Sequence, residues 1–361
     1  MTSIQDDKLY AFTNRLKDRV VIITGAANGI GRETALQVAS YGAKVVIGDL
    51  DVSGAEKTVR DIEAAGGTAV SRKCNVTSWD DQIALFDLAI AQFGVVDIVL
   101  ARDACHRVIF QVPNAGVTEI GSFHKVSFAH GKPVKPDTRT IDVNLFGVIY
   151  TTHLALHYLN VKRAARDDTL KAVVLIGSMG PQQTPEASWL GIPHGAMYAA
   201  SKHGVLGLMR SLYPEFALNN IRIATIHPFF ADTKIVPIPI KVLLAGIPLA
   251  PVPRVAGAII HAATNPDPET NGVAFLLNDD GPVFMVPREE FKLGVYKMID
   301  ERSNRLLSSA AGAAYYARLA KDYFRILGKP VLLAAVVAGA AKVGWERQAL
   351  ILQYVRKYVS L

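Results

Sequence analysis

The segment YAASK places a tyrosine and a lysine four residues apart, at Tyr198 and Lys202. Residues with this spacing lie on the same face of a helix. A tyrosine normally keeps its proton up to about pH 10, but a neighbouring ammonium group favours the phenolate. Such a tyrosine can take a proton from an alcohol as a hydride leaves, and can return it in the reverse direction. The pair therefore indicates acid–base chemistry on an alcohol or a ketone.

Two further polar residues could complete this chemistry. Ser178 ends the apolar run KAVVLIGS, where its hydroxyl could hold the substrate oxygen. Asn144, in VNLFG, could order a water molecule that relays protons to Lys202. A Tyr-x-x-x-Lys pair alone carries little information, because helices contain many such pairs. With the glycine loop described next, the NAG segment, the asparagine and the serine in chain order, coincidence is a poor explanation.

A glycine-rich loop, TGAANGIG at residues 24–31, joins the apolar run VVIIT to a helical pattern. Gly25, Gly29 and Gly31 allow the backbone to turn tightly and approach a pyrophosphate, and the helix that follows offers its N–H groups. Such a loop also fits an ordinary strand-to-helix turn, but this context favours a dinucleotide site. We expect Asn28 and Ile30 to belong to the same site.

Asp49 ends the second apolar run, about 20 residues beyond the loop. A carboxylate there accepts hydrogen bonds from the adenosine ribose hydroxyls and repels a 2′-phosphate, so it favours NAD over NADP as the cofactor. Asp51 is close enough to compete for this role, but Asp49 directly follows the apolar run. Asn75, at the end of the third run, could meet the edge of the adenine, with Val76 beside it.

Apolar runs alternate with helical patterns from residue 20 onward. VVIIT is a continuous β-branched run, typical of a strand buried on both faces. AKVVIGD, TAVSRKCNV, KAVVLIGS and IRIATIHP also read as strands, and helical patterns include one capped by Ser78 and a long one at about residues 137–159. The alternation predicts an α/β fold, a Rossmann-type doubly wound parallel sheet, with a C-terminal helical extension.

The composition excludes several classes of protein. The chain has 361 residues, 50% of them hydrophobic, and two cysteines, which provide no disulfide framework and suit a reducing, cytoplasmic setting. The N-terminus is polar and lacks the apolar segment of a secretory signal. The longest apolar run, residues 331–341, is about half as long as a spanning helix. The histidines are scattered, and Cys105 with His106 would supply only two ligands to a metal.

The net charge of +7 resides in the C-terminal tail. Residues 301–361 contain 10 Lys or Arg against 3 Asp or Glu, an excess that equals that of the whole chain. The balanced body, residues 1–300, argues against nucleic-acid binding, and the tail has no recognisable reader motif. The tail shows apolar residues at helical spacing among its cations, so its helices could contact an anionic membrane surface, pack on the body, or pack across a dimer.

The sequence resembles the short-chain dehydrogenase/reductase family over about residues 19–287. The resemblance rests on TGAANGIG, Asp49, the turn NAG, Asn144, Ser178 and YAASK. Within the family, SKHGVLGLMRSL and NDDGPVF are most similar to the NAD-dependent group that includes 15-hydroxyprostaglandin dehydrogenase and many fungal secondary-metabolism dehydrogenases.

The resemblance implies a Rossmann fold, an oxidoreductase and a homodimer or homotetramer. It implies a proton-relay tetrad made of Asn144, Ser178, Tyr198 and Lys202. The cofactor contacts that it adds to those above are Asn114, Ala115, Gly116, Tyr198, Lys202 and Thr233.

The chain departs from the family pattern in four places. The family's aspartate after the third strand is Asn75, whose amide can still bond to adenine. Phe229 replaces the glycine that usually follows a proline after the sixth strand, so the loop backbone must be rearranged. The interval between Ser178 and Tyr198 is longer than usual, which would enlarge one wall of the substrate pocket.

The fourth departure is a doubled apolar run before NAG, at residues 96–100 and 108–112. Residues 100–111 read as about a dozen extra residues, which an unremoved intron in the coding sequence could also produce. If the insertion is genuine, either run could be the fourth strand of the sheet. We favour residues 108–112, because the strand must hold Asn114 against the cofactor.

The substrate is expected to be a hydrophobic secondary alcohol or ketone. Residues 229–253 occupy the position of the family's substrate lid, and Lys234 and Lys241 are the only cations in the apolar stretch 229–253. These residues could instead pack on the body or on a partner subunit. The leading hypothesis is an NAD-dependent oxidoreductase, and the alternative is a cofactor-bound scaffold or regulator that no longer catalyses and acts through its basic tail.

Overall fold

A nine-stranded sheet runs through the described part of the chain, in the order β1-β11-β10-β9-β8-β5-β2-β3-β4. Seven adjacent strands, β10-β9-β8-β5-β2-β3-β4, run parallel to one another. Strands β11 and β1 complete one edge of the sheet with antiparallel pairing. The strands are β1 Thr2–Ile4, β2 Val20–Thr24, β3 Lys44–Asp49, β4 Thr68–Lys73, β5 Ile98–Ala101, β8 Ala172–Ile176, β9 Arg222–Pro228, β10 Ala274–Leu277 and β11 Val283–Val286.

This computed structural model describes residues 1–101, 123, 125–161, 170–178, 195–231 and 245–291, with isolated positions beyond. The chain divides into two units, Met1–Leu293 and Gly294–Leu361. The fold set out below is that of the first unit. The predicted basic tail, residues 301–361, falls almost entirely outside the described residues, so its helices and its contacts stay predictions.

Helices alternate with the strands in sequence. The α-helices are α1 Asp6–Leu9, α2 Gly29–Ser40, α3 Val52–Ala64, α4 Trp79–Phe93, α5 Arg139–Ile141, α6 Gly147–Tyr158, α7 Ala196–Leu218 and α9 Val252–Thr264. Shorter turns are η1 Thr13–Leu16, the π-helical η2 Asp142–Phe146, η4 Pro268–Thr270 and η5 Arg288–Phe291. A separate hairpin consists of β6 Phe128–Ala129 and β7 Lys132–Pro133.

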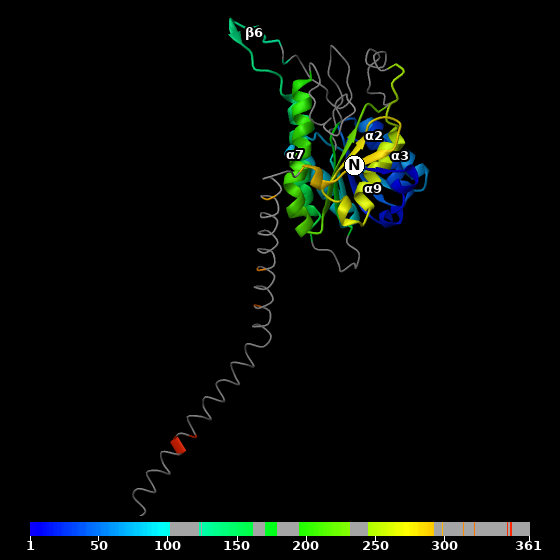
Figure 1. The fold of residues 1–361 in the computed structure, drawn as a ribbon, viewed down its shortest axis with the longest axis vertical. Helices are drawn as coiled ribbons and strands as arrows, with labels where there is room; N and C mark the ends of the chain where they lie inside the picture. The colour runs from blue at the N-terminus through cyan, green and yellow to red at the C-terminus, as the bar shows by residue number, and fades with distance from the viewer. Residues whose placement is uncertain are drawn as a thin grey trace, which may run out of the picture. The chain divides into compact units, whose positions relative to one another are not determined.

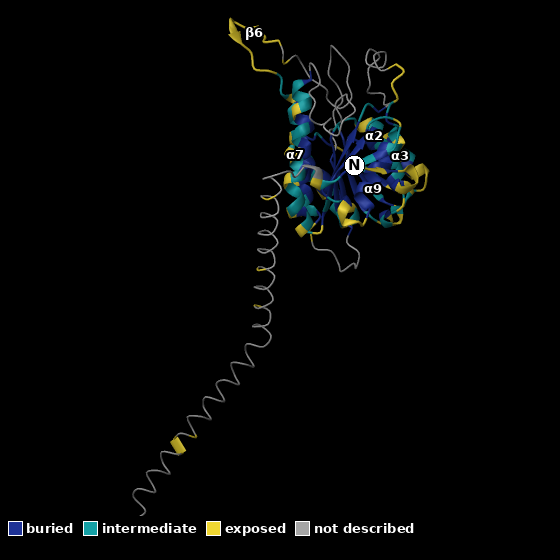
Figure 2. Cartoon of the chain, viewed as in Figure 1, coloured by how far each residue is buried: buried dark blue, intermediate teal, exposed yellow. Residues whose placement is uncertain are grey.

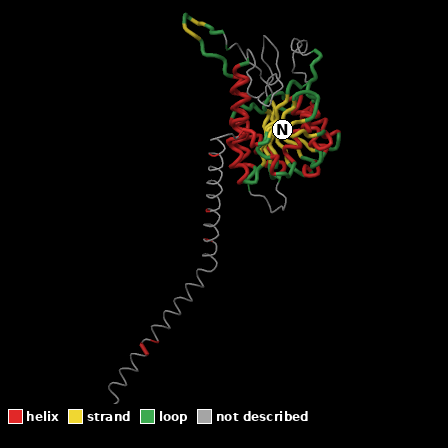
Figure 3. Tube along the Cα trace, in the orientation of Figure 1, coloured by secondary structure: helices red, strands yellow, loops and turns green. Residues whose placement is uncertain are grey.

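Both faces of the sheet are covered, as the continuous apolar strands predict. In β2, Val21 and Ile23 belong to the hydrophobic cluster that includes residues of α2 and α9, whereas Val20 and Ile22 belong to the cluster that includes residues of α4, α6 and α7. Figure 1 shows α7 on one side of the sheet and α2, α3 and α9 on the other. The central strands are buried (Figure 2), and helices flank them in two layers (Figure 3). The doubly wound, Rossmann-type fold is therefore confirmed.

The order of the strands reverses at β2. From this strand the chain first builds outward through β3 and β4, and then returns to build β5, β8, β9 and β10 on the other side. In open sheets of this kind, ligands bind beyond the carboxyl ends of the strands at the reversal point. The topology therefore brings the ends of β2, β3 and β8 to one edge of the sheet.

The preference for residues 108–112 as the fourth strand was wrong. The position between β2 and β8 is taken by β5, in which Ile98 pairs with Val21 on one side and with Ala172 on the other. Asp97 anchors this strand, because its buried carboxylate accepts the N–H of Val20 (2.9 Å) and its own N–H donates to Val20 O (3.0 Å). Residues 108–112 lie outside the described residues.

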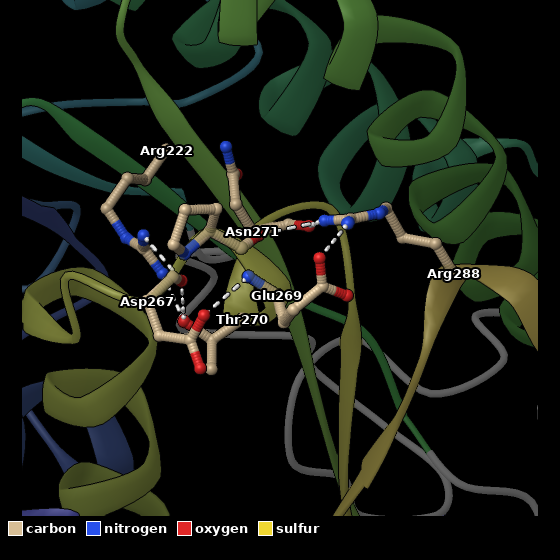
Figure 4. A network of polar contacts seen from close by, with 7 residues as sticks. Arg222, Asp267, Glu269, Thr270, Asn271 and Arg288 are labelled. Atoms are coloured by element: carbon tan, nitrogen blue, oxygen red, sulfur yellow. Dashed lines mark hydrogen bonds and ion pairs between the residues drawn. The ribbon is translucent and has the colours of Figure 1, made fainter.

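A polar network secures the opposite end of the sheet, where β9 begins (Figure 4). Arg222 donates to the hydroxyl of Thr270 (2.6 Å) and to the carbonyl of Asp267 (3.3 Å). Asn271 accepts the N–H of Ile223 (2.8 Å), and Arg288 donates to the carbonyl of Asn271. Burial lowers the pKa of Arg222 to about 10. This network holds η4 and the residues that lead into β10 against the start of β9.

Gly272, next to this polar network, offers a test of the packing. It has a φ of +72°, and a Cβ there would overlap Cδ2 of Tyr213. Gly66 has a similar φ of +82° but has no atom within 4 Å of an added Cβ. We expect Gly272→Ala to lower the free energy of unfolding by about 2 kcal/mol more than Gly66→Ala, since only the first variant adds overlap to backbone strain. Urea unfolding followed by circular dichroism measures both; equal losses would contradict the described packing.

Candidate active site

The glycine loop has the backbone geometry that its sequence predicted. Gly25 and Gly29 have positive φ values of 74° and 57°, which L side chains rarely adopt. The N–H of Gly25 donates to Gly48 O (2.8 Å), which ties the loop to the neighbouring strand. Helix α2 begins at Gly29, and Ile30 and Gly31 are buried in its first turn. The loop thus ends at a helix N-terminus, a backbone arrangement that can bind a phosphate group.

Asp49 closes β3 beside this loop and is 3% exposed. The N–H of Ala27 donates to its Oδ2 (2.9 Å), and the N–H of Asp51 donates to its Oδ1 (3.0 Å). Each carboxylate oxygen can accept more than one hydrogen bond. The carboxylate is therefore held in place by the backbone and can still accept hydroxyl groups from a ribose.

Asp51 has a different task. It is the N-cap of α3, where its Oδ1 accepts the N–H of Gly54 (3.0 Å) and the hydroxyl of Ser53 (2.8 Å). Its Oδ2 accepts the side-chain amide of Asn28 (3.4 Å), so this predicted cofactor residue links the glycine loop to α3. Of the two neighbouring carboxylates, Asp51 is the one engaged in holding the helix.

Asn75 and Val76 follow β4 at the same edge. The side-chain oxygen of Asn75 accepts both the N–H (3.1 Å) and the hydroxyl (2.9 Å) of Thr77. If Asn75 meets an adenine, its amide nitrogen is then the group that can do so, as a donor. Val76 is buried, and its carbonyl accepts the side-chain amide of Gln82 (2.6 Å).

Asn144 lies in the π-helical turn η2, between α5 and α6, and is fully buried. π-Helical turns are rare and are frequently found at functional sites. The amide of Asn144 donates to the hydroxyl of Ser201 (3.3 Å), which in turn donates to the carbonyl of Tyr198 (2.7 Å). Ser201 is a link that the sequence analysis missed, although it precedes Lys202 directly. It connects the π-helical turn to the helix that carries Tyr198.

Lys202 joins α7 to the end of β8. Its Nζ donates to the carbonyl of Ile176 (3.2 Å) and lies 5.7 Å from the centre of the Tyr198 ring, and the residue is only 6% exposed. Ser178 follows Ile176 by two residues, at the same strand end. The described contacts therefore bring Tyr198 and Lys202 together, link Asn144 to them through Ser201, and place Ser178 beside the carbonyl that Lys202 binds.

His227 is a second residue that sequence reasoning missed. It lies in β9 and is fully buried, and its Nδ1 lies 3.2 Å from the carbonyl oxygen of Ser178. Burial lowers the pKa of His227 to about 4, so the ring is neutral at neutral pH. The only sequence signal was a polar residue at the end of an apolar strand, directly before Pro228.

Phe229 replaces the expected glycine without breaking the sheet. Its N–H donates to Leu277 O (2.8 Å), which continues the pairing of β9 with β10, and its ring packs edge-on against Phe230. Beyond it, Ala231 pairs with Ala250, so the two ends of the predicted lid meet.

Several predicted site residues lie outside the described residues. They are Asn114, Ala115, Gly116 and Thr233, together with most of the lid. Among the helices that the structure describes, none is long and apolar enough to cross a bilayer. The same described residues contain no group of His, Cys, Asp or Glu side chains that could hold a metal ion.

Comparisons with known proteins identify relatives of this chain and a solved structure with the same fold. Residues 19–237 match the short chain dehydrogenase family. The cyclohexanol dehydrogenase of an Acinetobacter species is 30% identical over 74% of this chain and 91% of its own length. The cis-4-hydroxycyclohexanecarboxylate dehydrogenase of Sinomonas cyclohexanicum is 30% identical over 73% of this chain and 90% of its own.

A solved structure shares the fold. A short-chain type dehydrogenase/reductase from Mycobacterium marinum has a TM-score of 0.59 and 21% identity, and covers 75% of this chain and 97% of its own. The chain belongs to the short-chain dehydrogenase/reductase family, and it is an oxidoreductase that acts on alcohols or ketones. The family binds NAD(P). Membership in the NAD-dependent subgroup stays a prediction.

The buried ring of His227 makes stability depend on pH. In the unfolded chain, histidine takes up a proton near its ordinary pKa of 6.5, whereas the folded ring takes it up only near pH 4. As the pH falls through this range, the unfolded state binds the proton first, so the free energy of unfolding should fall by about 3 kcal/mol and then level off. Burial also lowers the pKa of His261, which adds a loss in the same direction.

Urea unfolding between pH 7 and pH 4 measures this loss, with His227→Asn as the control. The variant lacks the titrating ring and retains His261, so its free energy of unfolding should fall less steeply over the same range. Parallel pH profiles in the two proteins would show that His227 is not buried as described.

Proposed function

We propose that the protein is an NAD-dependent dehydrogenase that interconverts a hydrophobic secondary alcohol and its ketone. Asn144, Ser178, Tyr198 and Lys202 form the proposed catalytic group. The observation that carries the proposal is the buried hydrogen bond from Lys202 to Ile176 O (3.2 Å), since it holds the ammonium beside Tyr198 at the strand end that carries Ser178.

Each residue has a role that follows from its chemistry. A bound nicotinamide cofactor would supply the hydride acceptor. The hydroxyl of Ser178 holds the substrate oxygen by a hydrogen bond, and Tyr198 takes the hydroxyl proton as the C–H hydride departs. The ammonium of Lys202 stabilises the phenolate form of Tyr198, which is the form that accepts this proton. Asn144 orders the water through which the proton then reaches solvent.

The choice of NAD over NADP rests on Asp49. Its carboxylate is 3% exposed and is fixed by the N–H groups of Ala27 and Asp51. A 2′-phosphate at the same ribose would place about two negative charges against a carboxylate that cannot turn away, whereas ribose hydroxyls can donate to it.

The residues present also fit the rest of a dinucleotide. The positive φ values of Gly25 and Gly29 bring the loop to the N-terminus of α2, which can receive the pyrophosphate. The side-chain amide of Asn75 can donate to an adenine ring nitrogen, because its oxygen already accepts two hydrogen bonds from Thr77.

The substrate class rests on the lid and on the relatives. The lid sequence is almost entirely apolar, which favours a hydrophobic substrate. Two relatives are named for cyclohexanol and for cis-4-hydroxycyclohexanecarboxylate, which are both secondary alcohols on a six-membered ring. We therefore infer an alicyclic secondary alcohol, and propose a test panel of cyclohexanol, cis-4-hydroxycyclohexanecarboxylate and 2-octanol.

The catalytic role of Tyr198 is tested by Tyr198→Phe. We expect kcat for the best alcohol of the panel to fall by at least about 1,000-fold, since the variant loses the proton acceptor. NADH binding, followed by nicotinamide fluorescence, should change little. Tyr158→Phe is the matched control, because the Tyr158 hydroxyl donates to Asp87 (2.6 Å), outside the proposed site. A wild-type protein that binds NADH but oxidises no alcohol of the panel would contradict the proposed substrate class.

The cofactor preference is tested by Asp49→Asn. Removing the charge should lower kcat/KM with NAD and raise the ratio of NADP to NAD efficiency by about tenfold or more. Asp51→Asn serves as the control. It removes a carboxylate charge only two residues from Asp49 in sequence, but Asp51 caps α3. An unchanged ratio in Asp49→Asn, or an equal change in Asp51→Asn, would argue against Asp49 as the determinant.

A further inference from the structure

The chain that leaves β8 is held at three consecutive residues. The carbonyl of Ile176 accepts the ammonium of Lys202 (3.2 Å), and the N–H of Gly177 donates to Ile226 O (2.8 Å). The carbonyl of Ser178 is contacted by Nδ1 of His227 (3.2 Å). The strand end that leads to Ser178 is thus held from α7 at Ile176, and from β9 at Gly177 and Ser178.

The ring of His227 lies directly against Gly177. A Cβ on this glycine would overlap Cε1 of the ring and lie 2.5 Å from Nδ1. The ring is 0% exposed, so it cannot swing into solvent to make room. Glycine at 177 and histidine at 227 therefore fit each other, and together they set the path of the backbone at the end of the strand.

The protonation of the ring follows from its partner. A backbone carbonyl can only accept a hydrogen bond, so Nδ1 carries the proton and donates it to Ser178 O. Burial disfavours the imidazolium, and the positive charges of Lys202 and Arg210 disfavour it further. His227 is therefore a neutral donor at neutral pH and takes no part in moving protons.

We propose that His227 is a positioning residue that holds the Ser178 backbone, and through it the Ser178 hydroxyl, in the orientation that binds the substrate oxygen. This inference rests on the proposed function, because it needs Ser178 to contact the substrate. A displacement of about 1 Å in a positioned group can lower a rate by about 100-fold. The loss should appear in kcat, since His227 itself touches neither substrate nor cofactor.

The test compares His227→Asn with His227→Leu in the full-length chain, using NAD and the best alcohol of the panel above. The side-chain nitrogen of asparagine is as many bonds from Cα as Nδ1, so it can donate to Ser178 O, whereas leucine has no donor. We expect His227→Leu to lower kcat by about 100-fold, and His227→Asn to stay within about fivefold of the wild type. The Kd for NADH, from nicotinamide fluorescence, should change by less than about threefold in both variants.

Three results would overturn the inference while the proposed function stands, because the wild type turns over. They are an unchanged kcat in His227→Leu, equal losses in the two variants, and a loss of NADH binding that parallels the loss of kcat.

If His227→Leu does not fold, His227→Gln replaces it, since its amide nitrogen lies one bond further from Cα. Equal activity of the Gln and Asn variants would then overturn the inference. A wild type without turnover on any alcohol would overturn both proposals.

Discussion

The hydrogen bond from the Lys202 ammonium to the carbonyl of Ile176 is the interaction on which the site depends. A buried ammonium is costly unless it is paired and hydrogen-bonded. Lys202 is only 6% exposed, and its ammonium extends from α7 to a carbonyl at the end of β8. Because α7 also carries Tyr198, and β8 leads directly to Ser178, the bond holds a helix and a strand in a fixed relation at the proposed reacting atoms.

The topology of the sheet explains why these parts can meet. The order of the strands reverses at β2, so the ends of β2 and β3, which carry the glycine loop and Asp49, share one edge with the end of β8. Asp97 secures the strand at the reversal, since its carboxylate and its backbone both pair with Val20. The proposed cofactor residues and the proposed catalytic group therefore lie at the same edge of the sheet, although they come from segments far apart in the chain.

The departures from the family pattern have physical consequences that the structure makes specific. Phe229 does not disrupt the strand end, because its N–H continues the pairing of β9 with β10. Asn75 keeps a polar group after β4, where the family has an aspartate. Its side-chain oxygen accepts two hydrogen bonds from Thr77, so the group that could face an adenine changes from an acceptor to a donor. Both changes preserve the sheet, and the change at Asn75 alters which hydrogen bond this edge of the sheet could make to an adenine.

Local patterns in the sequence predicted the fold, the helix cap at Ser78, and the positions of the glycine loop, Asp49, Tyr198 and Lys202. The β-branched run of β2 requires cover on both faces, and a spacing of four residues places two side chains on one helix face. Each of these features is encoded within a few residues of the chain, so no knowledge of distant contacts was needed.

Only the tertiary structure decided which of two apolar runs is the fourth strand, because each run has four apolar residues out of five and the choice depends on pairing with β2 and β8. It also revealed Ser201 and His227, whose partners Asn144 and Ser178 are 57 and 49 residues away in sequence. A hydrogen bond between such distant segments leaves no periodic or local signal. It exists only because the sheet and α7 bring those segments together.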